Sequence, residues 1–371
     1  MNCPSDLNVL KIQAAVLRRK GGPLKIETLE MEGPRDDEAL VRIVASGICH
    51  TDIRYVDEWY EEAEGSLVLG HEGAGIVERV GKKVKRVRRG DHVVLSYQSC
   101  GRCRPCRSGH PADCRYLHEL NFGFKRLDGS NALHRSGGHG HFFGQSSFAT
   151  HALATERNLV KVPKNLPLEL LAPLGCGLQT GAGTVMNSLA VPTGASIAIF
   201  GTGAVGLAAV MAAGIVGARP IIGVDLVRSR LDLALELGAT HVIENRRDEV
   251  AARIQEITGS GVDYTLESTG DAKLYRLAVD VLNPKGTAAY LTGVSGPGSL
   301  SRGRKALSII AGDAVPQIFI PKLITLHRKG LFPLDRLETF YDFRQINRAM
   351  ADARRSRCIK PVLRINKPST L

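Results

Sequence analysis

The sequence lacks several features that would place it in a specialised class of protein. It shows no internal repeat at the periods of solenoid proteins, and its first ten residues contain neither the basic nor the apolar region of a secretory signal peptide. Charged residues make up 23% of the chain and apolar residues 43%, a balance that excludes disorder and collagen-like structure. We therefore expect a globular, cytoplasmic protein, and its 371 residues are enough for two domains of ordinary size.

The chain also lacks a concentrated basic tail, although its formal net charge is +12. The densest run of basic residues, from 82 to 89, is interrupted by Val84 and Val87 and ends at Gly90 and Asp91. This pattern favours a solvated turn before a strand over a groove that binds phosphates. We expect no nucleic-acid partner.

One uncharged stretch, from Ala195 to Ala218, is nominally long enough to span a bilayer. It contains five glycines, follows Pro192 and lacks flanking anchor residues. These features indicate a buried strand and helix, so we expect no membrane association.

Four of the eight cysteines lie within fifteen residues. In a reducing compartment, such a cluster indicates a metal site more than a disulfide framework. Four thiolates can close a tetrahedral shell around zinc and leave no position open for chemistry, whereas the spacing fits an iron–sulfur ferredoxin run poorly. The pattern therefore predicts a structural zinc, and the cluster consists of Cys100, Cys103, Cys106 and Cys114.

A second candidate metal site combines Cys49, His71 and Cys176, each of which lies among small residues. Two thiolates and one imidazole leave the fourth position of a zinc ion open for water or substrate. Spacing alone does not establish a zinc site here, because a single cysteine is more often a buried structural residue than a metal ligand.

The organisation of the chain changes near residue 195. Up to about Thr155 short β-rich segments alternate with turns, and residues 121–147 read as a long loop. From Ala195, strand and helix patterns alternate for roughly 100 residues, which predicts a doubly wound α/β fold with a parallel sheet. The last 45 or so residues contain a strand pattern at 361–365 that we expect to return to the first domain.

A glycine-rich turn, residues 201–206, lies between a predicted strand and a predicted helix. Gly201, Gly203 and Gly206 suit a tight turn, a close approach of pyrophosphate and close helix packing. Asp225 ends the next strand, where it can accept the ribose hydroxyls and repel a 2′-phosphate. The motif predicts a site for NAD rather than NADP. Because Arg228 and Arg230 lie nearby, NADP stays an alternative, and a site that is empty or binds a different nucleotide is a second alternative.

Taken together, these motifs resemble the zinc-dependent medium-chain alcohol dehydrogenases over nearly the whole chain. The segment from Gly70 to Val77 followed by Gly81 is similar to the zinc signature of that family, and the four-cysteine cluster, Cys176 and the glycine turn follow in the family's order. The segments 95–97 and 140–148 are most similar to the aryl (benzyl) alcohol dehydrogenase branch.

The resemblance implies a β-rich GroES-like catalytic domain and a Rossmann domain that binds NAD. It places the catalytic domain at 1–178, with the structural zinc lobe at about 98–116, the NAD-binding domain at 179–322, and a return to the catalytic domain at 323–371. It also implies a homodimer or homotetramer.

The resemblance further implies roles for individual residues. It assigns the catalytic zinc to Cys49, His71 and Cys176, and the second, structural zinc to the four-cysteine cluster. Around the catalytic zinc, Thr51 would take the alcohol proton, Asp52 would orient the histidine ligand and Glu72 would assist ligand exchange. The implied cofactor contacts are Gly201, Gly203, Val205, Gly206, Asp225 and Arg230, with Thr180 beside the nicotinamide and His50 and Lys360 near the pyrophosphate.

The implied reaction is the reversible oxidation of a primary, aromatic or allylic alcohol to its aldehyde, in an apolar cleft with Trp59, Tyr60, Phe142 and Phe143 as candidate lining residues. One position departs from the family, because Arg54 stands where many members have a histidine that ends the proton relay, and an arginine keeps its proton. Other readings are a polyol or secondary-alcohol dehydrogenase, a biosynthetic aldehyde or enal reductase, a catalytically inactive family member and, remotely, a nucleic-acid-binding zinc protein.

Overall fold

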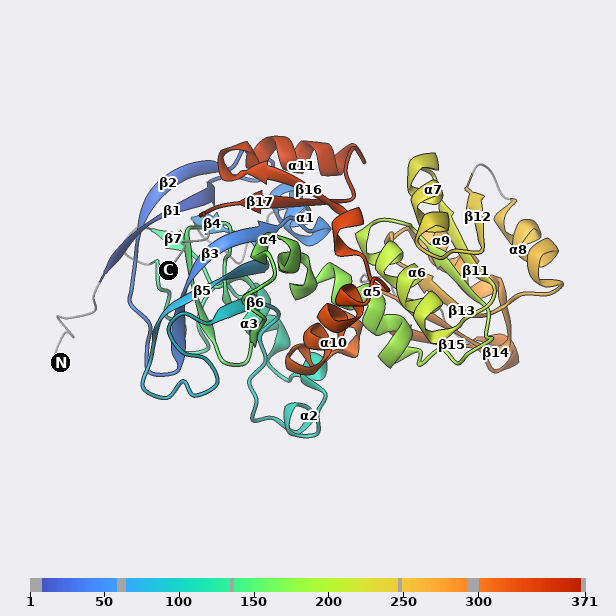
Figure 1. Cartoon of the computed structure of the whole chain (residues 1–371), viewed down its shortest axis with the longest axis horizontal. Coiled ribbons are helices and arrows are strands. Elements are labelled where there is room, and N and C mark those ends of the chain that lie inside the picture. The colour runs from blue at the N-terminus through green and yellow to red at the C-terminus, as the bar shows by residue number, and fades with distance from the viewer. Residues whose placement is uncertain (1–8, 59–64, 134–136, 246–248, 292–299, 368–371) are drawn as a thin grey trace. The chain divides into compact units, whose positions relative to one another are not determined.

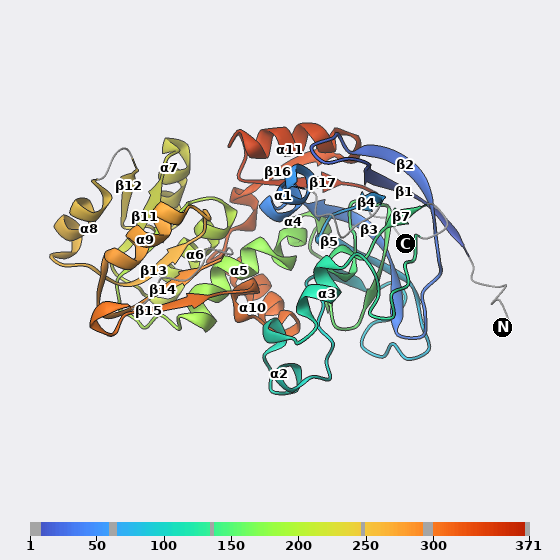
Figure 2. The ribbon, with the colours of Figure 1, turned by 180° about the vertical axis from the view of Figure 1, so that it is seen from behind.

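The structure is a computed structural model that describes residues 9–58, 65–133, 137–245, 249–291 and 300–367. The chain divides into two compact units. The first comprises Met1–Cys176, Val315–Ile324 and Leu334–Leu371, and the second comprises Gly177–Ala314 and Thr325–Pro333. Each unit contains its own sheets, as the ribbons in Figures 1 and 2 show.

The first unit is built from short, mostly antiparallel strands. A seven-stranded sheet has the order β16-β17-β3-β5-β6-β9, with β8 also paired to β3, and a four-stranded sheet has the order β2-β1-β4-β7. The strands are β1 (Leu10–Leu17), β2 (Lys25–Met31), β3 (Glu38–Gly47), β4 (Ser66–Val68), β5 (Glu72–Val80), β6 (His92–Leu95), β7 (Gly138–His139), β8 (His151–Thr155), β9 (Leu159–Lys161), β16 (Glu338–Asp342) and β17 (Lys360–Arg364). The α-helices are α1 (His50–Glu58), α2 (Arg104–Arg107), α3 (Leu117–Phe122), α4 (Leu168–Leu171) and α11 (Ile346–Arg354), while α10 (Pro316–Arg328) runs from this unit into the second.

The last strand lies beside a strand from the start of the chain. β17 pairs antiparallel with β3, so that Val362 is opposite Gly47, and the red and blue ribbons run side by side in Figure 1. The predicted loop at 121–147 contains the end of α3, the short strand β7 and a 3-10 turn, Phe142–Gly144.

The second unit contains a parallel six-stranded sheet with the order β12-β11-β10-β13-β14-β15. Numbered along the chain, this is the 3-2-1-4-5-6 order of a Rossmann fold. The elements are α5 (Gly177–Gly183), β10 (Ile197–Phe200), α6 (Ala204–Val216), β11 (Ile221–Asp225), α7 (Arg228–Glu236), β12 (His241–Glu244), α8 (Val250–Thr258), β13 (Val262–Glu267), α9 (Ala272–Asp280), β14 (Leu282–Tyr290) and β15 (Lys305–Ser308). The predicted fold class is therefore confirmed.

The uncharged stretch 195–218 forms β10 and α6 in the second unit. All four side chains of β10 are completely buried, as expected for a central strand of a parallel sheet that helices cover on both faces. Among the described residues, no helix has the length and apolar character needed to cross a membrane.

Candidate active site

Strand pairing in the first unit brings Cys49 and His71 together. β3 and β5 are antiparallel, and Gly47, at the end of β3, is opposite Glu72, at the start of β5. The residues just beyond these strand ends, Cys49 and His71, therefore lie close together. A Cβ atom on Gly47 would lie 2.1 Å from the Glu72 carboxylate, so the absence of a side chain there leaves room for that carboxylate.

Cys176 reaches the same place at the end of a 3-10 turn, Ala172–Gly175. The Ser96 hydroxyl donates a hydrogen bond of 2.6 Å to the Gly175 carbonyl. A Cβ on Gly175 would lie only 2.2 Å from the Leu95 carbonyl oxygen, so only glycine allows this close approach of two backbones.

The potential ligand atoms of Cys49, His71, Glu72 and Cys176 all lie within 4.8 Å of one another. His71 is completely buried, and its Nε2 atom has no hydrogen-bond partner among the described residues. An orphaned, buried ring nitrogen beside two thiols is the donor set that zinc prefers. The residues that are present therefore fit a zinc ion.

Asp52 fixes the orientation of His71. Its Oδ1 atom lies 3.0 Å from His71 Nδ1 and accepts a hydrogen bond from Gly70 N, while its Oδ2 atom accepts one from Cys49 N. A proton on Nδ1, held by this carboxylate, leaves the lone pair of Nε2 free for a metal. Burial opposes the charged imidazole, but Asp52 and Cys49 together outweigh burial and raise the pKa of His71 well above its usual value.

Lys360 and Glu72 form a buried ion pair beside this site. Lys360 Nζ donates to both carboxylate oxygens at 2.9 and 3.0 Å and to the Ile48 carbonyl at 3.2 Å. A hydrogen bond from Cys176 and the positive charge of Lys360 lower the pKa of the Cys49 thiol, which favours the thiolate that a metal requires. The predicted role of Lys360 near a pyrophosphate remains a prediction.

The other predicted residues of the first unit differ in their surroundings. Thr51 Oγ1 lies 3.8 Å from Cys49 Sγ, whereas the neighbouring His50 is exposed. Arg54 is exposed and pairs with Glu58 on the same helix. Trp59 and Tyr60 lie outside the described residues.

An aromatic cluster surrounds His71. The Phe143 ring is stacked on the imidazole, with centroids 4.4 Å apart, and Phe142 meets it edge-on at 5.5 Å. Phe142 is completely buried in the core, whereas Phe143 is half-buried, and the role of either ring in lining a substrate cleft stays a prediction. Phe122 also contacts Phe143, at 5.0 Å. The sequence gives no indication of this contact, because the only signal at Phe122 is its place at the start of the predicted loop.

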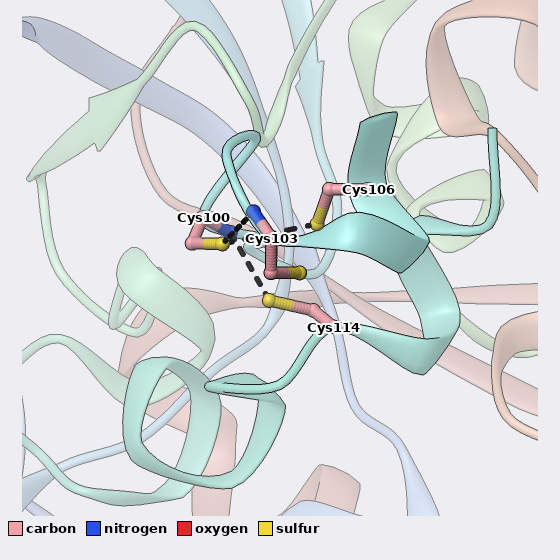
Figure 3. A group of neighbouring side chains, drawn as sticks. All are labelled: Cys100, Cys103, Cys106 and Cys114. Carbon is pink, nitrogen blue, oxygen red and sulfur yellow. Dashed lines mark hydrogen bonds between the residues drawn. The ribbon is translucent and has the colours of Figure 1, made fainter. Parts of the chain in front are cut away.

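The four-cysteine cluster is a separate site in the first unit (Figure 3). Its four sulfur atoms lie within 4.8 Å of one another, and the cluster contains no carboxylate or imidazole. Backbone N–H groups point at the sulfurs, from Cys100 to Cys114 and from Cys103 to Cys100. Backbone donors at Arg115 and Cys106 lower the pKa of Cys103 to about 6. This arrangement fits a zinc ion with no open position.

The glycine turn in the second unit lies between β10 and α6. Gly201 has a φ of +87°, and a Cβ on Gly206 would lie 1.8 Å from the Gly201 carbonyl oxygen, so helix and turn are in close contact. Gly203, by contrast, is next to open space, because the nearest atom to a Cβ placed on it would be on Arg230, 3.9 Å away. Val205, in the first turn of α6, is half-buried, and Thr180 lies in α5.

Asp225, at the end of β11, faces this turn. It accepts hydrogen bonds from Thr202 N at 2.7 Å, from Thr202 Oγ1 at 3.1 Å and from Val227 N at 2.9 Å. Arg230 lies 4.0 Å from the same carboxylate, and its buried Nε has no partner among the described residues. A carboxylate and a guanidinium therefore lie together beside the N-terminus of α6.

Comparisons with known proteins agree with this architecture. The family described as "Alcohol dehydrogenase GroES-like domain" matches residues 35–164, and the family "Zinc-binding dehydrogenase" matches residues 204–311. A geraniol dehydrogenase of Castellaniella defragrans is 45% identical over 98% of this chain and 100% of its own length.

Two solved structures are similar to nearly the whole chain. An alcohol dehydrogenase zinc-binding domain protein from Burkholderia ambifaria is 51% identical, with a TM-score of 0.93, over 97% of this chain and 100% of that one. A benzyl alcohol dehydrogenase from Acinetobacter calcoaceticus is 44% identical, with a TM-score of 0.92, over 96% and 100%. The chain therefore belongs to the zinc-binding medium-chain alcohol dehydrogenases, and it is a zinc-dependent alcohol dehydrogenase that uses a nicotinamide cofactor.

Proposed function

We propose that this enzyme interconverts a primary aromatic or allylic alcohol and its aldehyde with NAD, at a catalytic zinc held by Cys49, His71 and Cys176. The observation that carries the proposal is the convergence of these three side chains within 4.8 Å around an unpartnered imidazole nitrogen. The four-cysteine cluster would hold a second, structural zinc.

The aromatic surroundings of His71 support the substrate class. The half-buried Phe143 ring, stacked on the imidazole, offers an apolar wall next to the proposed reaction centre. A planar, unsaturated substrate gains more from such a wall than a polyol does. Two similar proteins carry names that fit this class, since geraniol is an allylic and benzyl alcohol an aromatic primary alcohol.

When bound, the zinc would supply a Lewis acid that makes the alcohol hydroxyl more acidic, and the oxidised nicotinamide would supply the hydride acceptor. Asp52 holds the imidazole in the tautomer that a metal needs, through its contact with Nδ1. Lys360 neutralises Glu72, so that this buried carboxylate adds no net charge beside the thiolates.

Thr51 is the proposed first acceptor of the alcohol proton, because its hydroxyl lies beside Cys49. A hydroxyl can accept one proton and donate another, so it can pass the proton on without carrying a charge. Arg54 cannot end such a relay, and its guanidinium is engaged with Glu58. The relay therefore ends in water or at His50, which is exposed at the first position of α1.

For the cofactor, we propose that Asp225 accepts the adenosine ribose hydroxyls, that Gly203 lies under the pyrophosphate, and that Arg230 and Thr180 contact the adenosine and nicotinamide ends. The open space at Gly203 and the N-terminus of α6 support this assignment. The proposed domains are catalytic for 1–178, NAD-binding for 179–322 and catalytic again for 323–371. The proposed assembly is a cytoplasmic homodimer or homotetramer.

The test is NADH absorbance across benzylic, allylic, short aliphatic and polyol substrates, with zinc counted in the same sample. We expect two zinc ions per chain and the highest kcat/KM on benzylic or allylic alcohols. A preference for polyols would overturn the substrate assignment. Full activity in a Cys49→Ala variant would overturn the proposed site.

A further inference from the structure

The Gln145 side chain connects two parts of the candidate active site. It is 3% exposed, and its Nε2 group donates to the His71 carbonyl at 2.9 Å and to the Ser96 carbonyl at 3.1 Å. Its Oε1 atom accepts a hydrogen bond from Gly73 N at 3.1 Å. Both amide protons are therefore used on carbonyl oxygens, and the amide oxygen is used on a backbone N–H, so the amide is matched to its site.

Ser96 extends this connection to the third proposed zinc ligand. Its side chain is completely buried, and its hydroxyl donates to the Gly175 carbonyl, one residue before Cys176. A chain of hydrogen bonds thus runs from the His71 backbone through Gln145 to Ser96 and on to the Cys176 segment. The two proposed zinc ligands that this chain connects, His71 and Cys176, are more than 100 positions apart in the sequence.

The backbone around Gln145 is packed tightly against the His71 segment. Ser147 N donates to the Gly70 carbonyl at 2.9 Å and Phe148 N to the Leu69 carbonyl at 3.0 Å. A Cβ on Gly73 would lie 2.7 Å from Ser147 Cβ and 3.1 Å from Gln145 Oε1, so this close contact requires glycine. Phe143, from the same turn, is stacked on the His71 ring. The segment 143–148 therefore holds both the backbone and the ring of His71.

We infer that Gln145 is a positioning residue, which sets the separation between the His71 and Cys176 segments and so keeps the proposed catalytic zinc in place. The inference rests on the proposed function, because it takes Cys49, His71 and Cys176 as the ligands. Because the polar atoms of the Gln145 side chain are engaged with backbone groups, its effect passes through the carbonyls of His71 and Ser96.

Two substitutions separate this role from simple packing. Gln145→Glu keeps the oxygen that accepts from Gly73 N, but it replaces the donating NH2 group with an oxygen that faces the His71 and Ser96 carbonyls. Gln145→Met keeps the length of the side chain and removes all of its hydrogen bonds. Ser66→Ala is the matched control, since Ser66 is buried in the first unit and its hydroxyl donates a hydrogen bond to Gly137 O, outside the segments that hold the proposed ligands.

The experiment follows zinc release from each purified holoenzyme to an excess of the chelating dye 4-(2-pyridylazo)resorcinol. We expect two phases in the unsubstituted enzyme, and the Cys49→Ala variant should lack one of them. In both Gln145 variants that phase should be accelerated roughly 10- to 100-fold, with the other phase unchanged, because partners that orient metal ligands have effects of this size. Ser66→Ala should release zinc like the unsubstituted enzyme.

The outcomes distinguish this inference from the proposed function. If the Gln145 variants unfold at a lower temperature but release zinc in unchanged phases, Gln145 is merely structural and the inference is overturned. If Cys49→Ala keeps both phases, the proposed function fails whatever Gln145 does. Should the Gln145 variants not fold, Ser96→Ala, which breaks the bond to Gly175, must accelerate the same phase for the inference to stand.

Discussion

The phenyl ring of Phe143 lies over the imidazole of His71, with ring centroids 4.4 Å apart and planes 24° apart. Phe143 holds this position with a φ of +53°, in the left-handed region. His141 and Ser146, in the same turn, also have positive φ values. Non-glycine residues in this region cost roughly 1 kcal/mol each or more, and they persist where surrounding contacts over-determine the backbone. This turn is therefore shaped to place a ring against the proposed zinc ligand.

Replacing Phe143 by leucine should lower kcat/KM for benzyl alcohol by about 2- to 10-fold relative to a short aliphatic alcohol, since an aromatic contact is worth about 0.5–1.5 kcal/mol. The measurement is the ratio of the two kcat/KM values. Phe340→Leu is the control, because Phe340 is a partly exposed aromatic residue of β16 that lies over Arg364. An unchanged ratio in Phe143→Leu would remove this residue from the substrate assignment.

Loss of zinc from the four-cysteine lobe should open the lobe to proteolysis. The hydrophobic cluster of the lobe is small, with Leu120 packed on Cys106 and Cys114, so the metal supplies much of the stability of the lobe. In the Cys103→Ser variant, we expect one zinc per chain instead of two. Arg102 and Arg107 are exposed, and trypsin should cleave after them at least about tenfold faster than in the unsubstituted enzyme. Cys358→Ser removes a buried thiol elsewhere in the first unit and should leave both the zinc content and the cleavage rate unchanged.

Replacing Asp225 by serine should shift the cofactor preference toward NADP. The substitution removes the charge that would repel a 2′-phosphate and frees Arg230, 4.0 Å away, to bind one. We expect the ratio of kcat/KM for NADP to that for NAD to rise by about 10-fold or more, since charge pairs of this kind contribute more than 1.4 kcal/mol. Asp232→Ser, which removes an exposed carboxylate paired with Arg228 on α7, is the control. A constant ratio would show that Asp225 does not select the cofactor.

The features that the sequence predicted are those in which residue type alone decides the chemistry. Thiolates at short spacing, a glycine turn between a strand and a helix, and an acidic residue at the next strand end each have one dominant physical use. The parallel sheet of the second unit followed from the alternation of strand and helix patterns. The first unit offered no such rule, because its strands are short and pair across long separations, such as β17 with β3.

The features that the sequence could not predict depend on contacts between distant backbones. Gln145 bonds to the His71 carbonyl 74 positions away, and a glutamine in a loop carries no sign of such a partner. The ion pair of Lys360 with Glu72, 288 positions away, was likewise not predicted, because nothing in the sequence around either residue indicates the other. Phe142 and Phe143 are adjacent and chemically identical, and only the turn geometry makes Phe142 completely buried and edge-on to His71 while Phe143 is half-buried and stacked on it.

Glu338 provides a prediction about pH, because it is a buried acid without a hydrogen-bond partner among the described residues. Both of its carboxylate oxygens are buried, and burial raises its pKa to about 9 although Lys360, its register partner on β17, opposes this rise. In the unfolded chain its pKa is about 4.3. Between these values the folded state holds a proton that the unfolded state has lost, so the free energy of unfolding decreases as pH rises, by up to about 1.4 kcal/mol per pH unit.

Glu338→Gln keeps the shape of the neutral acid and cannot lose the proton, so it should remove this slope. We expect the variant to match the unsubstituted enzyme in unfolding temperature near pH 5 and to exceed it by several degrees at pH 8 to 9, because each kcal/mol corresponds to a few degrees for a protein of this size. Glu119→Gln, at an exposed position of α3, should follow the unsubstituted enzyme at every pH. Thermal unfolding followed by circular dichroism from pH 5 to 9 measures all three curves. Parallel curves for Glu338→Gln and the unsubstituted enzyme would mean that Glu338 is ionised in the folded state, in which case Lys360 must be shared between Glu338 and Glu72.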